Sequence, residues 1–75
     1  MNFEITTGGR YTTVGGWVAF IMTFIDGNPT GYLTDSCGNT EPYFGTWDKD
    51  TGKCTKRGSY TEKEITTPYD ITDRI

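Results

Sequence analysis

The stretch WVAFIMTFI, residues 17–25, is the one long apolar run in the chain, and the rest of the fold must accommodate it. Gly15-Gly16 precedes the run, and Asp26-Gly27-Asn28-Pro29 follows it. Nine residues rich in β-branched and aromatic types, bounded by turn formers, favour a β-strand, since a helix usually needs more length. The run is also too short to cross a bilayer. We therefore expect a strand over residues 17–25.

Both faces of this strand are apolar. A strand with one solvated face alternates apolar and polar residues, whereas here Thr23 alone is polar. One face carries Val18, Phe20, Met22 and Phe24. The other face carries Trp17, Ala19, Ile21 and Ile25. Either the strand lies between two layers of its own fold, or one face meets another copy of the protein. We assign Trp17, Ala19, Ile21 and Ile25 to such an interface between protomers.

The composition favours strands and tight turns over helices. The 75 residues make a single domain, 1–75, of which 33% are hydrophobic and 15% aromatic. A chain of this length buries only about 60% of its unfolded surface, so it needs large aromatic side chains or a partner to be stable. There is one leucine but fifteen threonines and ten glycines. Such a balance is typical of short strands joined by glycine turns.

The turn signals divide the chain into short segments, and seven of these are candidate strands: residues 2–7, 10–14, 17–25, 32–34, 40–47, 53–56 and 69–72. We expect a sheet of five or six short strands. Loops or turns are expected at 26–31, 36–39 and 48–52. Residues 60–65 form either one helical turn or a β-like or irregular segment. This spacing predicts an all-β domain, a small antiparallel meander curled into an SH3-like barrel or a sandwich.

Charge and cysteine content narrow the possible environments. The net charge of −3 argues against a general DNA- or RNA-binding protein, which would normally be basic. The N-terminus lacks the charged and apolar regions of a signal peptide, so we expect an intracellular chain with reduced thiols. A disulfide between Cys37 and Cys54 is the alternative if the chain is exported by another route.

The chain resembles a loose group of small uncharacterised tailed-phage proteins. The matching residues are Gly9–Thr13, Gly16–Ala19, Asn28–Gly31, Asp35–Gly38, Trp47-Asp48, Gly52 and Tyr69–Ile71. The resemblance covers about residues 8–73, and most matched positions are turn residues. The chain departs from the group at Trp17, where a basic residue is usual, and in its longer 53–67 stretch. The resemblance implies no activity. It implies an accessory phage protein made in the host bacterial cytoplasm, and many such proteins blunt host defences.

Catalysis and metal binding have weak signals. The chain has no histidine, which is the commonest general base and a frequent metal ligand. Cys37 has no neighbour that would lower the pKa of its thiol, so an inert turn cysteine is the better interpretation. Asp48 and Asp50 resemble the start of a calcium loop, but the glycine and the bidentate glutamate are misplaced. We therefore expect a protein that is not an enzyme and that holds no metal or cofactor.

Anion and base contacts give the strongest binding signal. Five of the seven basic residues could contact phosphate: Arg10, Lys53, Lys56, Arg57 and Lys63. Six aromatic residues could stack on a base: Tyr11, Tyr32, Tyr43, Phe44, Trp47 and Tyr60. The competing interpretation is that the rings form the core and the cations a solvated face. Our predicted ligand-binding residues are Arg10, Tyr43, Trp47, Lys56 and Arg57.

Two functions of different classes follow. In the first, the protein sequesters a cyclic or other nucleotide immune signal in pockets between protomers of a homo-oligomer. In the second, it is an acidic inhibitor that caps a basic site on a bacterial defence enzyme, with tyrosine and tryptophan as anchors or with a strand edge paired to the partner's sheet. Neither function involves a membrane or general nucleic-acid binding.

Overall fold

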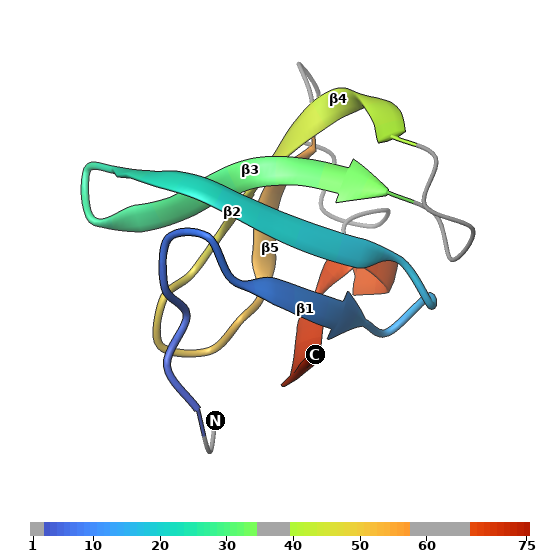
Figure 1. The fold of residues 1–75 in the computed structure, drawn as a ribbon, viewed down its shortest axis with the longest axis horizontal. Helices are drawn as coiled ribbons and strands as arrows, with labels where there is room; N and C mark the ends of the chain where they lie inside the picture. Colours follow the sequence, from blue (N-terminus) through green and yellow to red (C-terminus); the bar gives the residue numbers. More distant parts are fainter. Residues whose placement is uncertain (1–2, 35–39, 58–66) are drawn as a thin grey trace.

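The computed structural model describes residues 3–34, 40–57 and 67–75, and these form one curled antiparallel sheet (Figure 1). Six strands make up the sheet: β1 (Arg10–Thr13), β2 (Val18–Ile25), β3 (Asn28–Thr34), β4 (Thr40–Trp47), β5 (Cys54–Arg57) and β6 (Ile71–Arg74). A short 3₁₀ helix, η2 (Thr67–Tyr69), precedes β6. The sheet order is β5-β4-β3-β2-β1-β6. The predicted all-β antiparallel fold is confirmed.

The two edges of the sheet approach each other because the sheet curls into a half-barrel. The Ile71 amide at the start of β6 donates to the Gly52 carbonyl before β5, over 2.8 Å. The Cys54 amide donates to Asp70 Oδ1 over 2.7 Å. These bonds join the first strand of the order to the last and limit the exposure of both edges.

The N-terminal segment differs from the prediction. Residues 2–7 were expected to form a strand, but the described part, 3–7, contains none. The segment instead lies against the sheet: Phe3 stacks on Tyr11, and Ile5 is buried. The Tyr11 hydroxyl accepts a hydrogen bond from the Thr6 amide and donates to the Glu4 carbonyl. A buried tyrosine needs such partners, and here irregular backbone supplies them better than a strand would.

The turn after β2 is tighter than predicted. Residues 26–31 were expected to be a loop, but β3 already begins at Asn28. Asp26 and Gly27 both have positive φ, 53° and 82°, as a two-residue type I′ hairpin turn requires. The long hairpin of β2 and β3 that results extends beyond its neighbours (Figure 1). The closing strand, expected at 69–72, is β6, displaced two residues by η2. The turn expected at 36–39 and the alternatives for 60–65 lie outside the described residues.

A β-bulge in β2 determines which of its faces is buried. Ile25 pairs with Asn28 and Thr23 with Thr30, as a regular hairpin requires. The register then shifts at Met22, so that Ala19 pairs with Leu33 and Phe20 pairs with Tyr32. Beyond the bulge, Ala19 and Ile21 point into the core and are fully buried. Phe20 points outward and is 38% exposed.

Gly31 permits this bulge. A Cβ atom at Gly31 would overlap the Phe20 carbonyl oxygen. A backbone atom cannot move aside as the end of a flexible side chain can, so any larger residue would force the two strands apart. The bulge therefore depends on the absence of a side chain at position 31.

The core is small and combines aliphatic side chains with two large buried aromatic ones. It consists of Ile5, Tyr11, Ala19, Ile21, Leu33, Trp47, Cys54 and Ile71, with Phe3, Trp17 and Tyr69 packed against it. Trp47 is the largest fully buried side chain, and its indole lies over Gly45, where a Cβ would overlap the ring. The Trp47 Nε1–H donates to the Tyr69 carbonyl over 2.7 Å. This bond ties β4 to η2 across the core.

We predict that Gly31→Ala destabilises the protein far more than Gly27→Ala. At Gly27 an added Cβ meets no atom within 4 Å, and the cost is that of a positive φ, about 1 kcal/mol. At Gly31 the clash with backbone should cost about 3 kcal/mol or more. Urea denaturation of both variants measures the difference. Equal midpoints for the two would contradict the tight packing at position 31.

Candidate functional site

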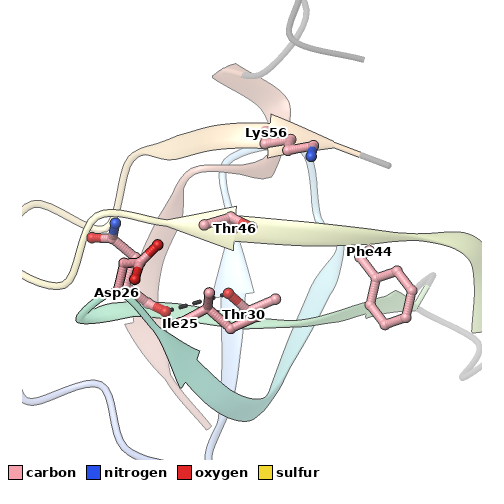
Figure 2. Close-up of a pocket in the computed structure, with 7 residues that line it drawn as sticks. Ile25, Asp26, Thr30, Phe44, Thr46 and Lys56 are labelled. Carbon is pink, nitrogen blue, oxygen red and sulfur yellow. Dashed lines mark hydrogen bonds between the residues drawn. The ribbon is translucent and has the colours of Figure 1, made fainter. Parts of the chain in front are cut away.

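A groove of about 430 Å³ lies on the outer face of the sheet, opposite the core. Seven residues line it: Ile25, Asp26, Asn28, Thr30, Phe44, Thr46 and Lys56. They come from β2, the turn after it, β3, β4 and β5 (Figure 2). Sites for small molecules commonly measure 300–1,000 Å³, so the groove has the size of a small-ligand site.

Cross-strand register brings the lining residues together. Thr30 on β3 pairs with Thr46 on β4, and Thr46 pairs with Lys56 on β5. Directly paired residues project from the same face of a sheet, so the two hydroxyls and the ammonium form a polar row. The Thr30 hydroxyl also donates to the Asn28 carbonyl over 3.3 Å, which is the dashed bond in Figure 2.

Aromatic side chains form a second row beside the polar one. Phe20 pairs with Tyr32, and Tyr32 pairs with Phe44. The Tyr32 and Phe44 rings are stacked with centroids 4.6 Å apart. Phe44 belongs to both the row and the groove, and it is 50% exposed. The outer face therefore offers an exposed aromatic ring next to a cation and two hydroxyls.

The structure places the predicted ligand-binding residues at different parts of the sheet. Lys56 lies in the groove and is exposed. Arg10 is exposed too, but it lies on β1 and is not among the residues that line the groove. The backbone of Tyr43 and of Arg57 belongs to β4 and β5, and their side chains lie outside the described part of the structure. The structure thus does not bring Arg10 and Lys56 together.

The prediction that Trp47 binds a ligand is wrong. We expected its ring to stack on a ligand, but it is fully buried and its indole N–H is already bonded to Tyr69. Two residues earlier, Gly45 leaves the inner face of β4 open, and the indole occupies that space. Among the described side chains of β4, the exposed ring is that of Phe44. It was among the six aromatic candidates, and strand alternation from a buried Trp47 would have identified it.

The prediction of a protomer interface through Ala19 and Ile21 is also wrong. Ala19 and Ile21 are fully buried in the core of the single chain, so they cannot form a contact between protomers. Trp17 is half-buried and packs against Tyr69, with ring centroids 5.8 Å apart. Ile25 is the one member of the expected set that is exposed, at 55%. The bulge at Met22 explains this split of the expected set. It places Ile25 on the same outer face as Phe20, while Ala19 and Ile21 point into the core.

The Asp48 carboxylate stabilises the turn between β4 and β5. Its carboxylate accepts hydrogen bonds from the Asp50 amide (2.8 Å) and the Thr51 amide (2.9 Å). These bonds, that from Thr51 first, hold the pKa of the Asp48 carboxyl below its ordinary value of 3.8. Gly52 completes the turn with a φ of 76°. Among the described residues there is no cluster of three metal-ligating side chains.

The Cys54 thiol is buried and donates to the Lys56 carbonyl over 3.2 Å. Cys37 lies outside the described residues, so its two predicted alternatives, an inert turn thiol and a disulfide with Cys54, stay predictions. In the described ranges, no helix has the length and apolar character needed to span a membrane.

Comparison of the chain with protein-family models, with curated proteins and with solved structures finds no match.

We predict that Trp47→Phe lowers the free energy of unfolding by about 2 kcal/mol, since it leaves the Tyr69 carbonyl without its indole partner and opens a cavity. Trp17→Phe, at a half-buried position, should cost less. Chemical denaturation measures both. A Trp47→Phe variant as stable as the wild type would contradict the buried hydrogen bond.

Asp48 should make stability depend on pH in the acid range. A carboxyl with a lowered folded-state pKa contributes stability above its unfolded pKa, and that stability is lost as the pH falls through the folded value. Asp48→Asn keeps an oxygen acceptor but cannot titrate, so its stability should vary less than that of the wild type below about pH 4. NMR titration of the Asp48 carboxyl should give a pKa below 3.8. A value above 3.8 would contradict the assignment.

Proposed function

We propose that this chain is a non-enzymatic phage accessory protein that sequesters a small nucleotide-class ligand and thereby counters a bacterial immune signal. The observation that carries the proposal is the groove in which Phe44, Lys56 and two threonine hydroxyls converge. The phage origin, the host cytoplasm and the role against defence rest on the resemblance described above.

The groove offers a complementary group for each part of a nucleotide. The exposed Phe44 ring, backed by Tyr32, can stack on a base. The Lys56 ammonium can pair with a phosphate as a point charge. The Asp26 carboxylate and the Asn28 side chain, at the hairpin end of the groove, can hydrogen-bond to sugar hydroxyls. These are three different chemistries within one groove, which favours a ligand that is itself composite.

Sequestration suits this lining better than turnover. Among the described residues, those that line the groove include one carboxylate, Asp26, and one cation, Lys56. General acid–base chemistry commonly uses a histidine or a second carboxylate held near the reacting atoms, and the chain has no histidine. Binding without reaction needs only shape, stacking and charge. The proposed protein therefore acts in stoichiometric amounts, by lowering the free concentration of its ligand.

The second candidate is a protein inhibitor that caps a basic site on a defence enzyme. The observation in its favour is the exposed aromatic row on an otherwise acidic protein of net charge −3. Exposed aromatic side chains are the usual anchors of protein interfaces. This candidate predicts that one host protein is recovered with the chain, and that the recovery is lost when Phe44 is changed.

The nucleotide proposal is tested by titrating the protein with cyclic dinucleotides, cyclic trinucleotides and adenine-nucleotide signals, using calorimetry and NMR shift mapping. We expect at least one of them to bind and to shift the amides of Thr30, Thr46 and Lys56. Phe44→Leu keeps an apolar side chain but removes the ring, and it should weaken binding about tenfold or more. Lys56→Gln should weaken it similarly by removing the charge.

Lys53→Gln is the matched control, because Lys53 is exposed but does not line the groove. It should leave the affinity within about twofold, since an isolated surface charge contributes little. No binding by any nucleotide, or equal losses in Lys53→Gln and Lys56→Gln, would overturn the nucleotide proposal and favour the inhibitor.

A further inference from the structure

We infer that the outer aromatic face, defined as Phe20, Met22, Ile25, Tyr32 and Phe44, is the interface of a homodimer whose second copy covers the groove. This deepens the proposed function and rests on it for the identity of the ligand. The dimer itself is argued from exposure, register and charge.

The area of the face matches what a dimer needs. Phe20, Met22, Ile25 and Phe44 are 38–55% exposed. Fully exposed side chains of this size present roughly 200 Å² each, so the four together leave about 350–400 Å² of apolar surface in water, before Tyr32 is added. A standard interface buries about 800 Å² per partner, and homodimer interfaces are about 65% apolar, which requires about 500 Å². The face therefore supplies most of the apolar area of one standard interface.

The aromatic row is complementary to itself. Cross-strand register fixes the order Phe20, Tyr32, Phe44 across β2, β3 and β4. This order reads the same in both directions. With a two-fold axis in the plane of the face and perpendicular to the row, Phe20 of one copy meets Phe44 of the other and Tyr32 meets Tyr32, so aromatic rings contact aromatic rings and the dimer closes.

The charges favour a second copy over other occupants. Arg10 and Lys56 lie on β1 and β5, on either side of the three strands that carry the row. Asp26 lies at the hairpin turn. In the part of the chain that the structure describes, the face has too few cations for a nucleic acid and too few carboxylates for a basic protein. An apolar centre with charges at its rim is the composition of a homodimer interface.

Dimerisation would convert the groove into a pocket between subunits. Ile25 and Phe44 belong both to the aromatic face and to the groove lining. A second copy packed on them would lie over the open side of the groove. The ligand would then be enclosed and its electrostatic contacts with Lys56 strengthened by the exclusion of water.

The test is the mass of the full chain in solution, measured by sedimentation and light scattering without any nucleotide. We expect twice the chain mass at about 100 μM. Phe20→Glu should raise the dimer dissociation constant at least tenfold. Phe20→Thr, a fold-compatible change in a strand, should raise it in the same direction. Val14→Glu is the matched control, because Val14 is 58% exposed in the turn after β1, where its amide donates to the Asp70 carbonyl next to β6, and it is not part of this face.

A monomeric wild type overturns the inference, whichever nucleotide binds. So does a dimer that persists in Phe20→Glu and Phe20→Thr, or one that is lost equally in Val14→Glu. A dimer that responds to both Phe20 variants and binds no nucleotide supports the inference and overturns the proposed ligand. Circular dichroism of each variant shows whether it is folded, and Phe20→Thr decides the question if Phe20→Glu does not fold.

Discussion

The bulge at Met22, opposite Gly31, is the constraint on which the rest of the structure depends. Side chains alternate along a strand, so a shift of one residue exchanges the two faces. The type I′ turn at Asp26-Gly27 sets a register that, if continued without interruption, would pair Phe20 with Leu33. The bulge shifts this register by one residue, and Ala19 takes the place opposite Leu33. The core then closes around small and aliphatic side chains.

This shift has a direct consequence for the surface. With Ala19 and Ile21 inside, Phe20 must face outward, where it continues the row of Tyr32 and Phe44. The remaining core volume is filled by Trp47, whose indole needs the bare backbone of Gly45 beneath it. Two glycines are therefore required, one for the outer aromatic row and one for the packing of the core. Gly31 allows the bulge that exposes the aromatic row, and Gly45 admits the tryptophan that fills the core. The exposed aromatic face and the compact core come from the same packing arrangement.

The strand content was predictable because it depends on local sequence. Turn formers bound residues 17–25, and that strand and the strand over 40–47 appear as β2 and β4. The identity of the buried face was not predictable from β2 alone, since both of its faces are apolar. The Asp26-Gly27 turn was a usable signal that we interpreted as part of a longer loop. Even with that turn recognised, a regular hairpin would have buried Phe20, because nothing local to Met22 indicates a bulge.

The candidate site was predictable only in part, for a related reason. Lys56 and Phe44 were recognised as binding types from composition, but their convergence depends on the register of three strands. Trp47 and Arg10 were chosen for their chemistry, while burial and sheet order separate them from the groove. Residue type indicates what a side chain can do, whereas register decides what it can reach.

The position of the outer aromatic face depends on the pairing of β2 with β3. Proton–proton Overhauser contacts across the hairpin in solution would measure that pairing directly. The structure predicts contacts of Phe20 with Tyr32 and of Ala19 with Leu33. Contacts of Phe20 with Leu33 would mean that the hairpin is regular and that Phe20 lies in the core. They would contradict the outer aromatic face and the dimer proposed on it.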